Sequence, residues 1–158
     1  MIVLKSQIDL QKLHADVKQL DYHMDGSGAL MAFGPSMGIP SIIGPYIQDA
    51  IKEISEYRNL TALHLMINKL PTRCYVPFHI DTLIPTSKQG KDPHLERWHL
   101  PVITNLECFW QNLDEEPIHF QAGMWYGPVR YWVPHSVWNA GNIKRIHLVV
   151  DLDSERVE

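Results

Sequence analysis

The spacing of apolar residues changes near residue 60 and divides the chain into two parts. Before that point, apolar side chains recur every three or four positions, which predicts a helix over about residues 6–20 and a second over residues 43–57. Pro45 is compatible with the second helix only if it lies in the first turn. Between the two helices we expect a Gly- and Pro-rich loop, residues 26–40.

From Leu60 onward the apolar period becomes two, as in β-strands with one buried face. Turn-forming residues separate the alternating segments, and about eight short strands with no helix between them favour an antiparallel sandwich or jelly roll. The expected strands cover residues 60–68, 73–81, 96–104, 108–112, 118–121, 124–126, 136–139 and 144–152. We therefore predict a mainly β fold with two N-terminal helices packed outside it. Residues 1–158 are expected to form one domain, with a helical part over 1–59 and a β core over 60–152.

Composition excludes several classes of protein. The 158 residues are 45% apolar and 20% charged, which is ordinary for a globular domain. The net charge of −4 disfavours a nucleic-acid binder, because such proteins depend on neutralising phosphates. Cys74 and Cys108 form no CxxC pair, so neither a zinc knuckle nor a disulfide framework is indicated. No apolar run is typical of a signal peptide or membrane span, and we expect a cytoplasmic protein that contacts no membrane.

His79 and Asp81 form the first candidate site. Residues two apart on a strand project to the same side, so this imidazole and this carboxylate would face the same space. Phe78 and Ile80 would project into the opposite layer. A histidine and an aspartate on one face can bind a single divalent metal ion, although a surface-exposed polar pair explains the same pattern.

A second candidate site follows from a predicted hairpin between residues 133 and 145. If Ala140, Gly141 and Asn142 form a three-residue loop, His135 and Arg145 share one face of the two strands. On the last strand, Ile146, Leu148 and Val150 form an apolar face, and Arg145 lies on the other side. The alternative is a surface hairpin with an exposed arginine.

Arg97 and His99 share a face of another predicted strand, with Trp98 and Leu100 on the opposite side. A guanidinium and an imidazole on one strand face suit a bound carboxylate, and a solvated sheet face is the alternative.

Taken together, the three candidate sites indicate one kind of chemistry more specifically than any of them does alone. Two histidines and one carboxylate with open coordination positions are the facial triad of non-haem Fe(II) oxygenases. With the order His79-x-Asp81, Arg97-x-His99, His135 and Arg145, the sequence resembles the aspartyl/asparaginyl β-hydroxylase-like branch of 2-oxoglutarate- and Fe(II)-dependent oxygenases, over about residues 60–152. Gly123-Met124-Trp125 and the segment from His135 through Asp151 also match.

The resemblance implies a double-stranded β-helix, the cupin-like form of the jelly roll. It implies Fe(II) ligation by His79, Asp81 and His135, pairing of Arg145 with the distal carboxylate of 2-oxoglutarate, and co-substrate contacts from Arg97 and His99. Some members of this branch lack the carboxylate ligand, and Asp81 places the chain with those that have the complete triad.

The expected function is therefore that of a dioxygenase. It would use Fe(II), 2-oxoglutarate and O₂ to hydroxylate a C–H bond of an amino acid, peptide or protein side chain, with succinate and CO₂ as co-products. We expect it to bind a small-molecule or peptide substrate, and we do not expect it to bind nucleic acid. Two alternatives stay open: a cupin-like metalloenzyme that does not use 2-oxoglutarate, and a jelly-roll binding or structural module. The sequence predicts neither the particular substrate nor the oligomeric state.

Overall fold

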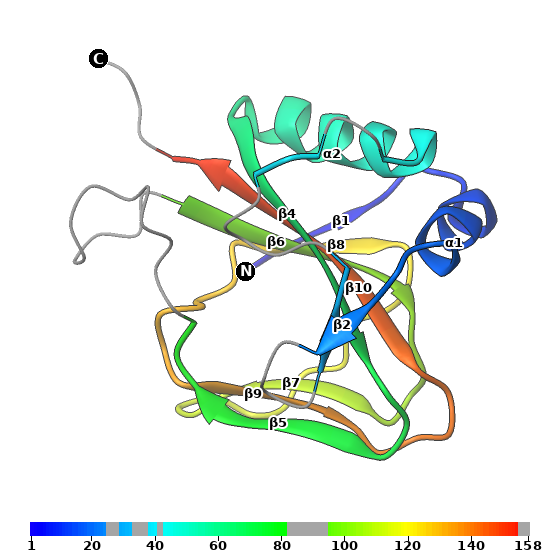
Figure 1. Cartoon of the computed structure of the whole chain (residues 1–158). Coiled ribbons are helices and arrows are strands. Elements are labelled where there is room, and N and C mark those ends of the chain that lie inside the picture. Colours follow the sequence, from blue (N-terminus) through cyan, green and yellow to red (C-terminus); the bar gives the residue numbers. More distant parts are fainter. Residues whose placement is uncertain (25–28, 33–37, 41–42, 82–94, 155–158) are drawn as a thin grey trace.

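The structure, a computed structural model, describes residues 1–24, 29–32, 38–40, 43–81 and 95–154. Its elements follow the chain in the order β1 (Ile2–Lys5), α1 (Leu10–Lys18), β2 (His23–Met24), β3 (Leu30–Met31), α2 (Pro45–Arg58), β4 (Thr61–Leu70), β5 (Cys74–His79), β6 (Leu95–Ile103), β7 (Cys108–Asn112), β8 (Met124–Gly127), β9 (His135–Asn139) and β10 (Arg145–Asp153). In Figure 1, the two helices lie on one side of the long strands β4, β6 and β10, and strands β5, β7 and β9 lie on the other side.

The strands form two antiparallel sheets. The larger has the order β1-β8-β6-β10-β4-β3-β2, and the smaller has the order β5-β9-β7. Strand β10 lies in the middle of the larger sheet, where it pairs with both β4 and β6. This arrangement is that of a double-stranded β-helix with two N-terminal helices outside it, and the expected fold class is confirmed.

The two helices begin and end at residues that suit those positions. The Asp9 side chain accepts hydrogen bonds from the first turn of α1, so this helix is shorter than the segment 6–20 predicted for it. Pro45 occupies the first turn of α2, as the sequence required. At the other end of α2, Asn59 adopts the left-handed conformation that closes many helices. Among the helices of the described segments, none combines the length and apolar character needed to cross a bilayer.

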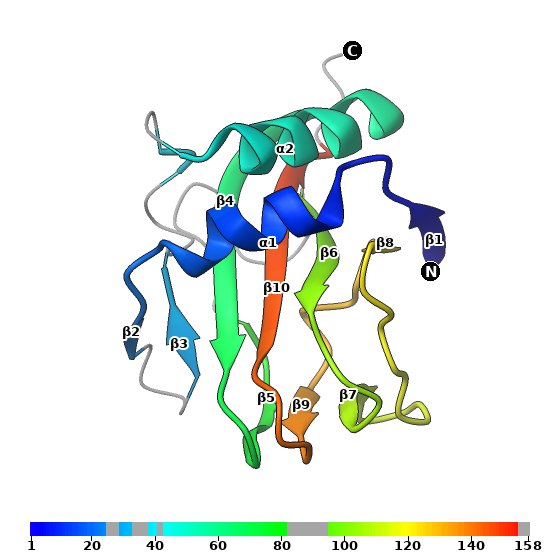
Figure 2. The same cartoon turned by 90° about the vertical axis from the view of Figure 1, so that its right-hand side faces the viewer.

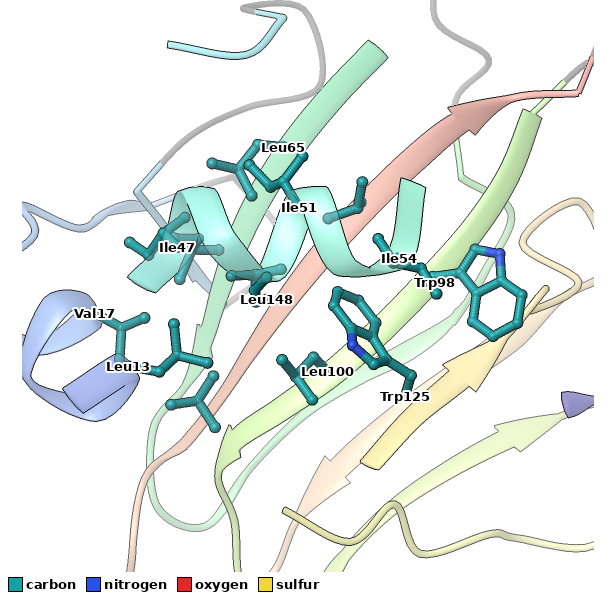
Figure 3. Packing of buried hydrophobic residues seen from close by; sticks show 14 of the residues in the cluster. Leu13, Val17, Ile47, Ile51, Ile54, Leu65, Trp98, Leu100, Trp125 and Leu148 are labelled. Carbon is teal, nitrogen blue, oxygen red and sulfur yellow. The ribbon is translucent and has the colours of Figure 1, made fainter. Parts of the chain in front are cut away.

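The main hydrophobic core lies between the helices and the outer face of the larger sheet, which α1 and α2 cover in Figure 2. Both helices direct apolar side chains toward this sheet: Leu13 and Val17 from α1, and Ile47, Ile51 and Ile54 from α2 (Figure 3). On the sheet, these side chains pack against Leu65, Leu100, Leu148 and Trp125. Ile146, Leu148 and Val150 all belong to this core, so the apolar face predicted for the last strand is buried as expected. Because helices and sheet share one core, we propose that residues 1–158 fold as a single domain.

Two local predictions are wrong. Residues 133–145 do not form a hairpin: β9 belongs to the smaller sheet and β10 to the larger, so the chain crosses between sheets at this point. Residues 118–121 form no strand and contribute one isolated bridge, between Ile118 and Trp110. Strand β1 was not predicted. The loop expected over residues 26–40 lies largely outside the described residues, and within it Leu30 and Met31 form β3.

Phe78 and Ile80 were expected to project into a layer opposite that of His79 and Asp81, and instead they are exposed. Their exposed fractions are 44% and 56%, because none of the described residues forms a second layer over the side of β5 opposite the cavity. The smaller sheet has one buried face, so strand alternation identifies the two faces without saying which of them is covered.

Leu148→Ala should lower the free energy of unfolding by about 2–5 kcal/mol, because Leu148 is fully buried in the main core and its loss leaves a cavity. Leu106→Ala, at a position that is 82% exposed, is the matched control and should change stability by less than about 0.5 kcal/mol. Urea unfolding of both variants measures the difference. Equal effects of the two substitutions would contradict this description of the core.

Candidate metal centre

A cavity of about 470 Å³ lies between the two sheets. The larger sheet contributes Arg97 and His99 from β6 and Arg145 from β10, and the smaller sheet contributes His79 and His135. All six site residues predicted from the sequence line this one cavity: His79, Asp81, Arg97, His99, His135 and Arg145.

His79, Asp81 and His135 converge on one point. His79 of β5 lies directly opposite His135 of β9, and their ring centroids are 4.5 Å apart. Asp81 follows the end of β5, and its Oδ1 lies 3.1 Å from Nε2 of His79 and 3.3 Å from Nε2 of His135. One ligand atom from each residue falls within 4.8 Å of the others, which is close enough for a single ion.

Backbone carbonyls fix the orientation of both imidazoles. Nδ1 of His79 lies 2.7 Å from the carbonyl oxygen of Pro77, and Nδ1 of His135 lies 2.8 Å from that of Val133. A carbonyl can only accept, so each Nδ1 carries a proton, and this contact turns each Nε2 toward Asp81. The indole of Trp110 stacks on the His135 ring at 4.4 Å and holds its plane.

Asp81 is held by its backbone and by its carboxylate. Its N–H donates to the carbonyl oxygen of Tyr131 at 3.2 Å, although no strand continues through this residue. Its Oδ2 accepts a hydrogen bond from Nη1 of Arg97. Burial by itself would raise the pKa of Asp81, but hydrogen bonds from His135 and His79 and the charge of Arg97 outweigh it and hold this pKa well below its usual range. The carboxylate is therefore ionised and available as a ligand.

Arg97 lies between two carboxylates. Besides contacting Asp81, its Nε and Nη2 donate to the two oxygens of the buried Asp151 at 2.7 and 2.8 Å. Burial would lower the pKa of Arg97, and the two carboxylates raise it beyond its ordinary value. The positive charge of Arg97 is thus already compensated within the protein.

Arg145 is in the opposite situation. It is 4% exposed, and no carboxylate of the described residues lies within ion-pair distance of it. Its Nη2 donates instead to Nδ1 of His147 at 3.0 Å. Burial lowers the pKa of Arg145 to about 10, so the guanidinium is still charged at neutral pH. A buried cation without an anion is costly, which makes this end of the cavity attractive to a negatively charged ligand.

The histidines beside Arg145 are neutral. Burial, followed by the charge of Arg145, lowers the pKa of both His99 and His147 well below the usual value. Nδ1 of His147 accepts from Arg145 and lies 3.3 Å from Nδ1 of His99. Nε2 of His99 is buried and has no hydrogen-bond partner among the described residues.

The sequence did not identify every residue that lines the cavity or supports the residues that do. Asp151 and His147 alternate with Arg145 on the polar face of the last strand, which was visible, but the pairing of Asp151 with Arg97 depends on the register between β10 and β6. Nothing in the sequence distinguished Trp110 from the other tryptophans as the one that stacks on His135.

The sequence profile of the family described as aspartyl/asparaginyl β-hydroxylase matches residues 42–155 of the chain. No curated protein sequence gives a significant match.

Solved structures share the fold at low sequence identity. A prolyl-4-hydroxylase from Pseudomonas putida aligns with a TM-score of 0.67 and 12% identity, over 98% of this chain and 92% of its own. The viral collagen prolyl hydroxylase from Paramecium Bursaria Chlorella virus-1, solved as its 2OG complex, aligns with a TM-score of 0.65 and 11% identity, over 98% and 96%. A 2OG-Fe(II) oxygenase family oxidoreductase from Burkholderia pseudomallei gives 0.60 and 10%, over 92% and 78%.

The profile covers more than half of the chain, including all six site residues predicted from the sequence. The chain therefore belongs to the aspartyl/asparaginyl β-hydroxylase family and is a non-haem iron dioxygenase.

Proposed function

We propose that the protein binds Fe(II) through His79, Asp81 and His135, binds 2-oxoglutarate at Arg145, and hydroxylates a C–H bond of an amino acid, peptide or protein side chain. The observation that carries this proposal is the pairing, in one cavity, of a three-ligand cluster with a buried and uncompensated guanidinium.

The residues fit the ion. Two imidazoles, each with its Nε2 directed inward, and one ionised carboxylate make a donor set typical of non-haem Fe(II) sites. The carbonyl bonds of His79 and His135 fix these orientations before any ion arrives, so little reorganisation is needed on binding. When bound, Fe(II) would supply the activation of O₂ that accompanies conversion of 2-oxoglutarate to succinate and CO₂.

The other end of the cavity fits a carboxylate. Arg145 presents a charged guanidinium that His147 orients without neutralising, because an imidazole acceptor carries no negative charge. The distal carboxylate of 2-oxoglutarate would supply the missing counter-charge. A metalloenzyme that used no keto acid would leave this buried charge without a role, and a binding module would require neither end of the cavity.

His79→Ala and His135→Ala should each weaken binding of Mn(II), used as an inert substitute for Fe(II), by at least about 100-fold, because each removes one of three ligands. His119→Ala is the matched control: Nδ1 of His119 also lies close to a backbone carbonyl, that of Cys108, but the residue lies outside the cluster. Isothermal titration of the folded variants measures the affinities. Full affinity in either cluster variant would remove that histidine from the metal site.

Arg145→Gln should weaken 2-oxoglutarate binding to the metal-loaded protein by about 10- to 100-fold, because it removes charge-assisted hydrogen bonds to a carboxylate. Mn(II) affinity should change by less than about threefold, since Arg145 does not contact the ligand cluster. Arg130→Gln, which changes an arginine at the surface, is the control and should alter neither affinity. An equal loss of both affinities in Arg145→Gln would indicate general disruption of the fold.

Turnover tests the proposal as a whole. With Fe(II), 2-oxoglutarate, ascorbate and O₂, the wild-type protein should release succinate slowly even without a substrate to hydroxylate, and faster when its amino-acid or peptide substrate is added. Metal binding without succinate release would favour the metalloenzyme that uses no keto acid. The absence of both would favour the binding module.

A further inference from the structure

We propose that Arg97, fixed in place by Asp151, is a positioning residue of the metal centre that restricts Asp81 to ligation through one oxygen. This inference rests on the proposed metal site and differs from the co-substrate contact that the sequence led us to expect for Arg97. It assigns Asp151 the role of holding Arg97 in the orientation that contacts Asp81.

The two oxygens of Asp81 have different partners. Oδ1 faces the Nε2 atoms of His79 and His135, in the position of a ligand, whereas Oδ2 is hydrogen-bonded to Nη1 of Arg97. Asp81 lies past the end of β5, where strand pairing no longer fixes the side chain. Without Arg97, the carboxylate would be free to rotate about its last bond and present either or both oxygens to the ion.

Arg97 itself cannot rotate. Its Nε and Nη2 form two parallel bonds to Asp151, and the face of its guanidinium lies 4.7 Å from the centre of the Tyr131 ring. The guanidinium is planar, so fixing this edge also fixes the direction of Nη1, which points to Asp81. Arg97 and Asp151 are direct cross-strand partners of β6 and β10, which anchors the pair in the larger sheet.

The charges of the two arginines separate their roles. Arg97 is shared between two carboxylates and has no unbalanced charge to offer a dianionic co-substrate. Arg145, with a neutral histidine as its partner, keeps its charge for the ligand. If Asp81 chelated the ion with both oxygens, it would also take a coordination position that the co-substrate or O₂ requires.

Asp151→Asn tests this inference directly. It removes the charge that balances Arg97 and one of the two bonds that orient it, so the guanidinium should compete with the ion for Asp81. Mn(II) affinity should fall by about 10- to 100-fold, as is usual when a group supporting a metal ligand is lost. The affinity of the Mn(II)-saturated protein for 2-oxoglutarate should stay within about threefold of wild type. Isothermal titration of the full-length protein measures both.

Asp114→Asn is the matched control. It also removes an aspartate that pairs with an arginine, Arg130, but at the surface and away from the cavity. Neither affinity should change. The visible absorption of bound Co(II) adds a second readout: it should shift in Asp151→Asn, where the ligand set is disturbed, and remain unaltered in Asp114→Asn.

Several outcomes would overturn the inference. Unchanged Mn(II) affinity with weakened 2-oxoglutarate binding would assign Arg97 to the co-substrate, and a lowered melting temperature with both affinities unchanged would make the pair purely structural. If Asp151→Asn does not fold, Arg97→Lys replaces it. A lysine keeps the charge but cannot span both carboxylates, and it should show the same selective loss of metal affinity.

Failure of the proposed function would look different. Wild-type protein that binds Mn(II) but releases no succinate would overturn the dioxygenase proposal, while the comparison of Asp151→Asn with wild type would still decide the role of Arg97. Wild-type protein that binds no Mn(II) would overturn both.

Discussion

The ion triple Asp81–Arg97–Asp151 is the interaction on which the arrangement of this site depends. It joins β6 and β10 of the larger sheet to Asp81, which lies just beyond β5 of the smaller one, and so connects the two walls of the cavity through buried charge. Each member is costly to bury alone, and together they satisfy one another. The same contacts keep Asp81 ionised and hold it between the imidazoles of His79 and His135. Nδ1 of each imidazole donates a hydrogen bond to a backbone carbonyl.

The two ends of the cavity illustrate how one residue type serves different purposes. Arg97 and Arg145 are equally buried, yet one is surrounded by carboxylates and the other by imidazoles that burial keeps neutral. The partner, not the arginine, determines whether positive charge remains for a ligand. A carboxylate beside Arg145 would neutralise the proposed anion site, and an imidazole in place of Asp151 would leave Arg97 to draw Asp81 away from the proposed metal site.

Much of this could be predicted from the sequence, because strand alternation places His79 with Asp81, Arg97 with His99, and Arg145 opposite the apolar face of β10. The apolar residues spaced every three or four positions predicted the two helices, and Pro45 lies in the first turn of the second helix as expected. Contacts between strands that are distant in the sequence could not be predicted. The sharing of Arg97 between Asp81 and Asp151 depends on pairing across more than fifty positions and on how the two sheets approach one another. The hairpin expected at residues 133–145 failed for a related reason: a short Gly-containing connection can close a hairpin or carry the chain from one sheet to the next, and its local sequence fits both.

That crossing from β9 to β10 has a consequence for ligand length. It places His135 on one wall of the cavity and Arg145 on the other, although they are only ten positions apart in the sequence. A molecule that reaches from the ion to the guanidinium must therefore bridge the space between the sheets, whose backbones in β-sandwiches are about 10 Å apart. Under the proposed function, this separation would favour diacids of matching length, because one with fewer carbons would reach only one of the two groups at a time and a longer one would have to bend.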